Sequence, residues 1–214
     1  MVLLCIFKKF GIYSRDCYSF LFKKFKIKVG HCGTLDKYAR GLLLVVTGNS
    51  TKLSCVITKF NKTYFFTLIF HCDTFSNDIY GFLNNYRFQY LKEDLVVNIV
   101  NYINSFNNLE FIQKCPLVSS KKIKGKSCYK YFLGNKKTVN NFNNQDFYSY
   151  NKVTVYTVKV CYYDCYSICI LSEVSSGFYV RSFVRDIGKM FNVYTCVYNI
   201  TRLKIGHFNI CHTF

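Results

Sequence analysis

No apolar run in this sequence is as long as a membrane-spanning helix requires, and the chain also lacks the pattern of a secretory signal. The first ten residues, MVLLCIFKKF, place a short apolar run before their charges, whereas a secretory signal carries its charges first. Internal repeats and segments typical of domain linkers are absent as well. We therefore expect one cytosolic domain covering residues 1–214, which is long enough to bury a substantial core.

Acidic residues are scarce. The chain has 11 Asp and Glu against 29 Lys and Arg, which gives a formal net charge of +18. Such a surplus favours a polyanionic partner, nucleic acid first, because binding releases counterions. A codon bias that fills protein surfaces with Lys and Asn explains the charge equally well, and the single proline beside many Phe, Tyr and Asn residues fits that explanation. Both interpretations stay open on charge alone.

Cysteine, by contrast, is abundant, with 12 residues. In a chain without an export signal, cysteines stay reduced and act as small hydrophobic side chains. Cys161, Cys165 and Cys169 lack the paired short-range spacing of zinc ligands, and they fall within two strand-like segments. We therefore expect no metal site.

Several segments have the pattern of β-strands. A short apolar run flanked by glycines predicts a buried strand from Leu42 to Val46, and aromatic and β-branched residues predict another from Tyr64 to Phe70. Two further runs, Val153 to Val160 and Ser167 to Val174, predict a hairpin. The Asn-rich segment from Gly134 to Lys152 is predicted to be a loop.

Three other segments have apolar residues at helical spacing. Their apolar faces are Leu53, Val56, Ile57 and Phe60 with Ser50 as N-cap; Leu95, Ile99, Tyr102, Ile103 and Phe106, beginning at Asp94; and Phe183, Ile187 and Met190, after a turn at Ser175-Ser176-Gly177. Strands and helices alternate without a strict βαβ order. The sequence therefore predicts an α+β domain built on a mixed or antiparallel sheet.

One acid is placed unusually. Asp36 lies in a loop between a glycine-rich turn and the predicted strand at Leu42, where desolvation would push an isolated carboxylate toward its neutral form. Arg181 lies at the start of the third helix, where the helix dipole disfavours a cation. A pair between them would relieve both conflicts and keep Asp36 ionised as a nucleophile. An isolated Asp and Arg more often cap a turn and extend into solvent, and spacing alone does not decide.

The order of the motifs does decide. GHCGTLDKYARGLL, KTYFF and SSGFYVRSFVRDIG resemble the three signature segments of the TruB-type tRNA pseudouridine-55 synthases, typically GHxGTLDPxAxGLL, KxY and SxGTYIRxLxxDxG. Between them, IQKCPLVSSKKIKGKSCYKY resembles QxPPxxSAxKxxGxxxY. KKFGIYS, from Lys8 to Ser14, resembles DKPxGxTS, and TFSNDIYG resembles TxTxDxxG. Motifs in the right order at compatible distances are a specific signal, and the resemblance runs from about Ile6 to Phe208.

This resemblance implies the pseudouridine synthase fold, in which helices and loops flank a central mixed or antiparallel sheet. It also implies an isomerase that acts as a monomer on a uridine in the T loop of tRNA. The enzyme breaks the N1 glycosidic bond, turns the base and joins C5 to the same sugar, with no cofactor or metal.

Residue roles follow from the motif positions. Asp36 matches the catalytic aspartate, Tyr64 matches the aromatic residue that stacks on the uracil, and Arg181 matches the arginine paired with the aspartate. His31 is the residue that would fill the gap left by the flipped base, and Ile200 matches an apolar contact near that base. The other positions assigned to substrate binding are Lys8, Gly33, Thr34 and Tyr179.

The chain departs from the family pattern around these residues. Lys37 replaces the proline that usually follows the catalytic aspartate, and Phe7 and Lys9 replace the Asp and Pro of DKP. These exchanges concern loop rigidity and binding strength more than chemistry. The sequence ends soon after Phe208, where bacterial members usually continue into a PUA-type RNA-binding domain, so we expect that domain to be absent.

Two alternatives share part of the pattern. A dyskerin-type synthase, which modifies rRNA with the help of guide RNAs, has the same catalytic segments together with a C-terminal RNA-binding domain. A non-catalytic tRNA-binding protein could act as a folding chaperone while keeping the remains of the site. Retention of Asp36, Tyr64 and Arg181 together favours the tRNA-modifying enzyme.

Overall fold

The structure is a computed structural model, and it describes residues 2–86, 91–116, 118, 122–123, 126–127 and 149–213. Its main element is a nine-stranded sheet whose hydrogen-bonded order is β1-β3-β12-β4-β11-β10-β7, with β2 paired to β3 and β13 paired to β12. These strands are β1 Leu3–Lys8, β2 Val29–His31, β3 Arg40–Thr47, β4 Lys62–Phe70, β7 Leu109–Lys114, β10 Tyr150–Tyr163, β11 Ser167–Val174, β12 Thr195–Ile205 and β13 Phe208–Asn209.

Short helices and two small sheets complete the described part of the chain. The helices are α1 Ser19–Phe25, α2 Ser54–Ile57, α3 Glu93–Asn104 and α6 Val180–Phe191, with 3-10 turns η1 Gly48–Leu53 and η3 Ile210–His212. The small sheets pair β5 Cys72–Thr74 with β6 Leu83–Tyr86, and β8 Lys122–Ile123 with β9 Lys126–Ser127.

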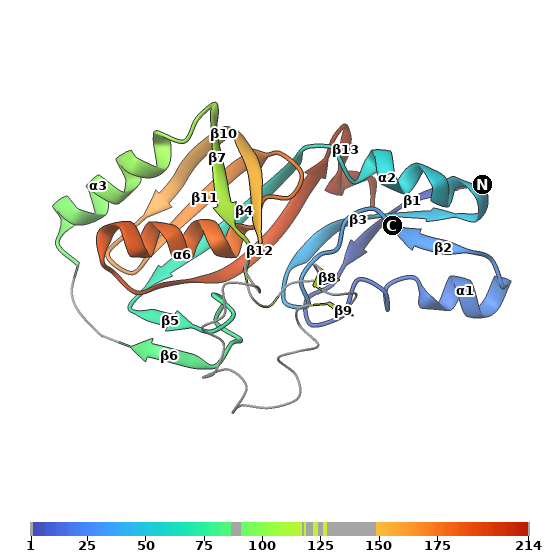
Figure 1. The fold of residues 1–214 in the computed structure, drawn as a ribbon, viewed down its shortest axis with the longest axis horizontal. Helices are drawn as coiled ribbons and strands as arrows, with labels where there is room; N and C mark the ends of the chain where they lie inside the picture. The colour runs from blue at the N-terminus through green and yellow to red at the C-terminus, as the bar shows by residue number, and fades with distance from the viewer. Residues whose placement is uncertain are drawn as a thin grey trace.

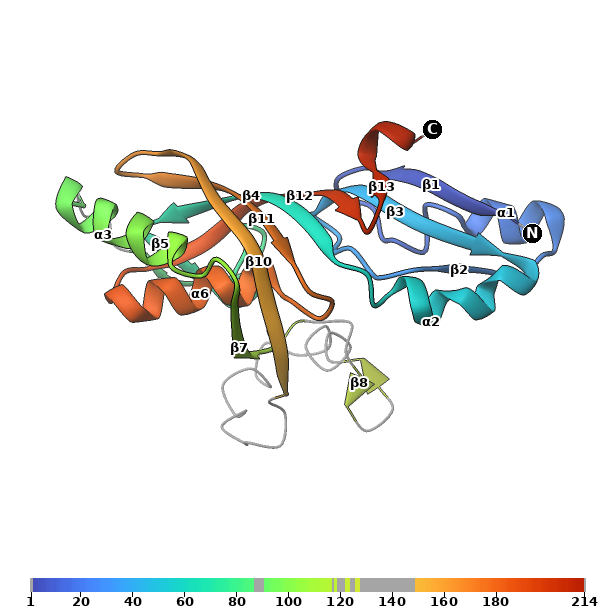
Figure 2. The ribbon, with the colours of Figure 1, turned by 90° about the horizontal axis from the view of Figure 1, so that it is seen from above.

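Strands β4 and β12 run through the middle of the molecule and join its two halves (Figures 1 and 2). One half carries α3 and α6 on β10, β11 and β12, and the other carries β1, β2, β3, α1 and α2. Among the described strand pairs, β3 and β12 run parallel and the others are antiparallel. The mixed sheet with flanking helices confirms the predicted α+β class.

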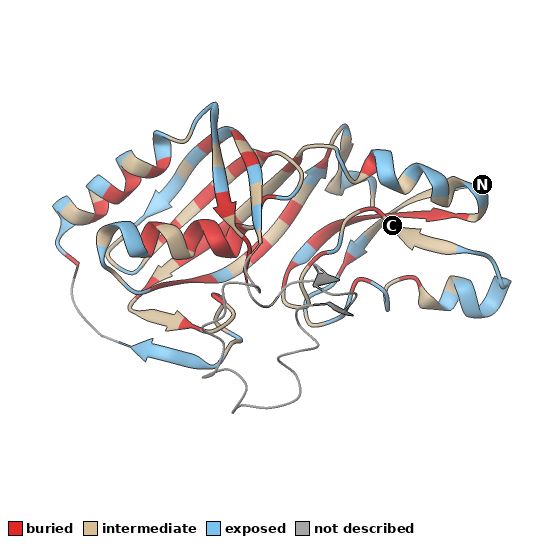
Figure 3. Ribbon diagram, viewed as in Figure 1, coloured by how far each residue is buried: buried red, intermediate tan, exposed pale blue. Residues whose placement is uncertain are grey.

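The largest core lies between the sheet and helices α3 and α6. Along β11 every second residue is buried, as expected for a strand with one covered face. Phe183, Val184 and Ile187 of α6 and Ile99 and Ile103 of α3 are buried in the same cluster. In Figure 3 the buried residues gather on the strands and on α6. This packing fixes the start of α6 against the sheet.

Strand β3 is covered on both faces. Leu42, Leu44 and Val46 belong to one apolar cluster, whereas Leu43 and Val45 belong to another on the opposite side. Alternating side chains of a strand point to opposite faces, so the continuous apolar run predicted from the sequence corresponds to two cores. The loop that carries Asp36 enters β3 at its first residue, Arg40, and is anchored by this buried strand.

The predicted strands, the hairpin, and the helices at residues 94 and 183 are confirmed, but three details are wrong. The segment from Ser50 to Phe60 is a 3-10 turn followed by a four-residue helix, and Leu53 and Val56 are exposed. Met190 on α6 is 64% exposed, because it lies in the last turn of the helix, beyond the sheet-facing side. The predicted loop from 134 to 152 lies outside the described residues up to 148, and β10 already begins at Tyr150.

Gly41 occupies the crossing of β3 and β12 and has no room for a side chain. Its φ is +116°, and a Cβ there would lie 2.8 Å from the backbone nitrogen of Arg202. We expect Gly41→Ala to lower the free energy of unfolding by about 3 kcal/mol or more, because both backbone strain and overlap contribute.

Gly11→Ala is the matched control for this prediction. Gly11 also has a positive φ, +82°, but nothing lies within 4 Å of the point that a Cβ would occupy. This variant should cost only the strain, about 1 kcal/mol. Equal urea midpoints for the two variants would contradict the expected overlap at the crossing.

Candidate active site

The structure joins Asp36 and Arg181, which are 145 residues apart in the sequence. Arg181 is the second residue of α6, and its Nε donates a hydrogen bond of 2.7 Å to Oδ2 of Asp36. The guanidinium is buried, with 4% of the side chain exposed, whereas 43% of the Asp36 side chain is exposed. The carboxylate is therefore held on its inner side and open to the surface on its outer side.

The other nitrogens of Arg181 are held by main-chain oxygens. Nη1 donates to the carbonyl of Ser76 and Nη2 to the carbonyl of Val118, each at 2.9 Å. Burial alone would lower the pKa of this guanidinium, but the charges of Asp36 and Asp78 outweigh burial and raise the pKa. Arg181 is thus a fixed cation whose orientation is set by four groups.

Gln113 determines how α6 begins. Its buried side chain donates from Nε2 to the carbonyl of Tyr179 at 3.1 Å, and its Oε1 accepts from the Tyr179 backbone N–H at 2.8 Å. Tyr179 is the N-cap residue of α6, and its side chain makes no cap hydrogen bond. The amide of Gln113 therefore places the first turn of α6, and with it Arg181.

Asp78 is a second acid beside the pair, which the sequence analysis did not single out. Its Oδ2 lies 4.0 Å from Nε of Arg181, and its Oδ1 accepts from the Ser76 hydroxyl and from the Tyr80 backbone N–H. Burial raises the pKa of this carboxyl above its ordinary value, and the Arg181 charge and the two hydrogen bonds only partly offset the rise. The match of TFSNDIYG to a family segment was the signal for this residue.

The N-terminal segment braces the Asp36 loop from outside. The Ser14 hydroxyl donates to the carbonyl of Leu35 and accepts from its N–H, both at 2.9 Å. The Gly11 N–H donates to the carbonyl of Lys37 at 3.0 Å. Lys8 adds bonds to the carbonyls of Lys37 at 3.0 Å and Ala39 at 2.6 Å. The main chain on both sides of the acid is thus fixed.

Arg202 braces the same loop from β12. Its guanidinium is buried and donates to three carbonyls, Leu42 at 2.9 Å, Gly33 at 3.1 Å and Thr34 at 3.4 Å. Gly33 has φ +98°, a conformation that favours glycine, and its carbonyl is one of these acceptors. The expected substrate-binding position Gly33 therefore shapes the loop.

Lys8 differs from its expected role. It is fully buried, and its ammonium is directed to backbone carbonyls of the loop, so in this structure it does not reach the surface to contact a substrate. Burial lowers the pKa of Lys8 to about 8. In the unfolded chain the pKa is near its ordinary value of 10.5, so above about pH 8 the unfolded state binds more protons than the folded one.

The contribution of Lys8 to the free energy of unfolding should therefore rise between about pH 8 and 10.5. We expect the stability difference between the wild type and Lys8→Met to shift in favour of the wild type when urea titrations are compared at pH 7 and pH 9.5. A difference that does not change with pH would mean that Lys8 keeps its ordinary pKa in the folded protein.

His31 has both ring nitrogens engaged. Nδ1 lies 2.8 Å from the hydroxyl of Tyr18, and Nε2 lies 3.1 Å from Oγ1 of Thr34. Burial, followed by the charge of Arg202, lowers the pKa of the ring. The imidazole is therefore neutral at pH 7 and held at the edge of the loop, with Thr34 exposed beside it.

A small cavity lies beside the ion pair. Its lining includes Asp36, Asp78, Arg181 and Ile200, together with Tyr38, Ala39, Tyr80, Val197, Tyr198 and Asn199. Its enclosed volume is about 10 Å³, room for about one water, so a nucleotide has to occupy its open mouth. Tyr64 is not among the lining residues. It lies on β4 opposite Arg202 of β12 and packs against the core cluster that contains Leu35 and Ala39.

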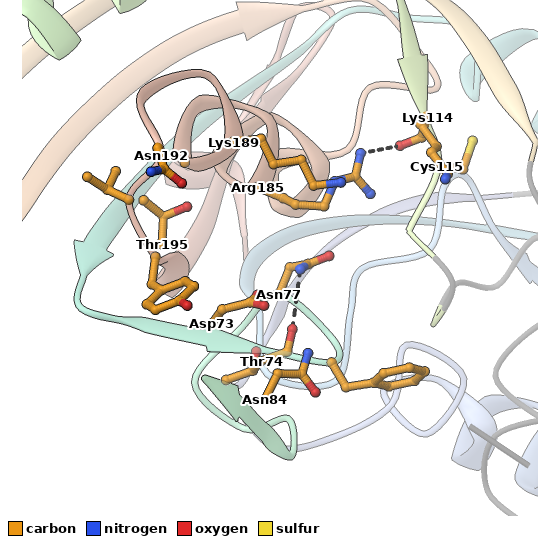
Figure 4. A pocket seen from close by; sticks show the side chains of 14 residues that line it. Asp73, Thr74, Asn77, Asn84, Lys114, Cys115, Arg185, Lys189, Asn192 and Thr195 are labelled. Atoms are coloured by element: carbon orange, nitrogen blue, oxygen red, sulfur yellow. Dashed lines mark hydrogen bonds between the residues drawn. The ribbon is translucent and has the colours of Figure 1, made fainter. Parts of the chain in front are cut away.

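A larger cavity of about 380 Å³ lies elsewhere, between α6, β5 and β6 (Figure 4). Lys114, Arg185 and Lys189 line it, and Arg185 donates to the carbonyl of Lys114 at 3.1 Å. No residue predicted for the site lines this cavity, and it lacks the Asp36–Arg181 pair. The smaller cavity is therefore the candidate active site.

Neither a metal cluster nor a membrane-spanning helix is found within the described ranges. No group of three or more His, Cys, Asp or Glu side chains there could hold a metal ion. Likewise, no helix among the described residues has the length and apolar character to cross a membrane. All eleven cysteines in this part of the chain are free thiols.

Comparisons with known proteins agree with this geometry. The TruB family pseudouridylate synthase N-terminal domain matches residues 21–180. A tRNA pseudouridine synthase B of Mycoplasmoides gallisepticum (strain R(low / passage 15 / clone 2)) is 33% identical over 211 residues, which cover 97% of this chain and 92% of the relative. The protein of the same name from Malacoplasma penetrans (strain HF-2) is 33% identical over 185 residues, 86% of this chain and 75% of the relative.

A solved structure resembles this chain over nearly its whole length. A chain in the crystal structure of a Cbf5-Nop10-Gar1 complex superposes with a TM-score of 0.67 at 21% identity, covering 97% of this chain and 49% of that one. The fold is therefore shared with that chain, while the family match over residues 21–180 gives the class, the pseudouridylate synthases, which are isomerases. With the match over residues 21–180 and these relatives, the chain belongs to the TruB family of pseudouridylate synthases.

Proposed function

We propose that this protein converts a uridine in the T loop of tRNA to pseudouridine, as a monomer in the cytosol. The observation that carries the proposal is the ion pair between Asp36 and Arg181 at the mouth of a cavity. The relatives named tRNA pseudouridine synthase B support tRNA as the substrate, and the net charge of +18 suits an RNA partner.

Asp36 is the proposed catalytic residue. Its carboxylate either attacks C1′ of the ribose or takes a proton from C2′, and N1 of the uracil leaves with the electron pair of the glycosidic bond. Arg181 orients the carboxylate, because it holds Oδ2 while 43% of the Asp36 side chain stays exposed. The rigid loop contributes by fixing this orientation before the substrate arrives.

The released uracil then turns until C5 faces C1′. The C5–C1′ bond forms as the bond to Asp36 breaks, or as C2′ regains its proton; C5 then loses its proton and N1 gains one, which restores the conjugated ring. The product has the same atoms as the substrate. Tyr64 is proposed to stack on the turning base, since a ring contact does not fix its orientation, and its hydroxyl is a candidate acceptor for the C5 proton.

Base flipping is the third part of the proposal. The uridine has to leave its stack in the T loop to reach Asp36. His31 would fill the vacated space, and Ile200, which is buried in the cavity lining, would contact the flipped base. For His31 to enter the RNA, its bonds to Tyr18 and Thr34 have to break. Tyr179 would pack next to the base through its side chain.

The test is to incubate the purified protein with an unmodified tRNA transcript and to map pseudouridine by carbodiimide modification and primer extension. We expect one modified position, in the T loop. Tight binding without any product would instead identify an RNA-binding chaperone, and product only on an rRNA fragment would identify a dyskerin-type activity.

A further inference from the structure

Three aromatic side chains from separate segments meet at the mouth of the candidate site. Phe10 follows β1, Tyr38 lies in the Asp36 loop, and Tyr80 lies in the turn between β5 and β6. The rings of Tyr38 and Tyr80 are stacked, with centroids 4.2 Å apart and an interplanar angle of 26°. The ring of Phe10 packs at 5.2 Å from Tyr80 and 5.6 Å from Tyr38. We call these three residues the aromatic cluster.

The aromatic cluster is continuous with the cavity of Asp36. Tyr38 and Tyr80 line that cavity together with Asp36, Asp78 and Arg181. Asp78 also links the two regions, because its Oδ1 accepts from the backbone N–H of Tyr80. A nucleotide that placed its ribose over Asp36 would therefore bring the next nucleotide of the same strand against these rings.

The rings are not buried as a core would require. Phe10 is 49% exposed and Tyr80 is 44% exposed, so each keeps a free face or edge toward solvent. Contiguous exposed apolar patches mark interaction or ligand-binding surfaces. The surroundings are basic, because Lys9 is exposed beside Phe10 and the Lys37 ammonium lies 5.2 Å from the ring centroids of both Tyr13 and Tyr38.

Flat aromatic surfaces with cations beside them match the chemistry of an unpaired nucleobase and its phosphate. Every base offers a π-face, which stacks on Tyr or Phe whatever the sequence, while Lys contacts the backbone. A peptide partner would bury the rings equally well, but it would not explain their continuity with a site that takes a ribose. On the basis of the proposed function, we infer that the aromatic cluster stacks a second base of the RNA, adjacent to the uridine that is modified.

The test measures RNA binding rather than turnover. All proteins carry Asp36→Asn, so that the RNA is not converted, and the ligand is an unmodified T-arm hairpin with 2-aminopurine on the 5′ or the 3′ side of the target uridine. The added changes are Phe10→Ala, Tyr80→Ala and Tyr80→Phe. Tyr162→Ala is the matched control, because Tyr162 is 57% exposed on β10 and does not line the cavity.

We expect quenching of 2-aminopurine at one flanking position, and Kd values for Phe10→Ala and Tyr80→Ala about 5- to 100-fold higher. Tyr80→Phe keeps the ring and should bind like the parent, as should Tyr162→Ala. When the RNA has an abasic site at the quenched position, the Kd of the parent should rise by the same factor. Tyr80→Ala should then raise the Kd no further.

Equal affinities for all variants would overturn the inference. A loss of affinity in Tyr80→Ala that is the same for intact and abasic RNA would also overturn it. The second result would assign the rings to packing or to contact with another protein segment. The readout also separates this inference from the proposed function. If the protein with Asp36 intact made no pseudouridine but the rings still stacked a base, the proposed function would fail and the inference about the aromatic cluster would hold. If the protein made pseudouridine normally and the ring variants bound RNA like the parent, only the inference about the aromatic cluster would fail.

Discussion

Asp36→Asn is expected to reduce the rate of pseudouridine formation by about a thousandfold or more, while the fold and the affinity for RNA remain. The amide has nearly the shape of the carboxylate, but it neither attacks C1′ nor accepts a proton from C2′. The change also removes the negative partner of Arg181, whose other bonds to the carbonyls of Ser76 and Val118 stay in place. Single-turnover assays on a tRNA transcript measure the effect.

Glu110→Gln is the control for this prediction. Glu110 forms an exposed ion pair of 2.7 Å with Lys152, away from the cavity, and the change removes the same charge. Its rate should equal that of the wild type. If Asp36→Asn kept more than about a tenth of the wild-type rate, Asp36 would not be the reacting group, and Asp78 would be the acid to examine.

Arg202→Met should lower stability about as much as Gly41→Ala, and unlike that change it should act directly on the Asp36 loop. The change leaves the carbonyls of Gly33, Thr34 and Leu42 without their buried donors, and each unsatisfied group costs about 1–3 kcal/mol. Since methionine also removes the cost of burying a charge, we expect a net loss of about 3 kcal/mol in the free energy of unfolding. Activity should fall as well, because the Asp36 loop loses its brace on the β12 side.

Arg40→Met provides the comparison. Arg40 is exposed and bonds to the hydroxyl of Thr201, the neighbour of Arg202, so its loss should cost less than about 1 kcal/mol. Arg202→Lys should recover only part of the stability, because the donors of an ammonium lie on one nitrogen, whereas the guanidinium reaches these carbonyls from three nitrogens. Urea titrations with the same midpoint for Arg202→Met and Arg40→Met would show that the buried bonds contribute nothing net.

The pairing of Asp36 with Arg181 could be predicted from sequence because each residue lies in a position that is unfavourable without an oppositely charged partner. A cation at a helix start and an acid before a buried strand each need a partner, and the motifs chose between the possible pairings. The structure contains that ion pair, at 2.7 Å between Arg181 and Asp36. The strands were predictable because their apolar runs are short and are either flanked by glycines or rich in aromatic and β-branched residues, which favours a strand over a helix.

The supports of the loop could not be predicted, because they depend on contacts between distant segments. An arginine within a polar part of a strand, such as Arg202, is usually solvent-exposed, and only the fold shows that this one is 1% exposed and bonded to three carbonyls. Lys8 was expected to bind substrate from its motif position alone, and its burial beneath the Asp36 loop depends on contacts that the motif does not contain. The helix at Leu53 and Val56 was predicted from apolar spacing, but the fold covers only Ile57 and Phe60 of that face and leaves Leu53 and Val56 exposed.

The exchange of proline for Lys37 illustrates how such contacts compensate for a lost local restraint. The carbonyl of Lys37 accepts from both the Gly11 N–H and the Lys8 ammonium, so its backbone is held without a pyrrolidine ring. This explains how the loop keeps its form although the motif departs from the family pattern at this position.

Because the braces of the Asp36 loop come from residues 8, 11, 14 and 202, the reactive centre is assembled from segments that lie far apart along the polypeptide. During synthesis on the ribosome the loop therefore lacks the three carbonyl bonds of Arg202 until β12 has emerged and docked. A nascent chain that stops short of β12 already holds the aspartate, the tyrosine and the arginine, yet it gains competence only when that strand arrives.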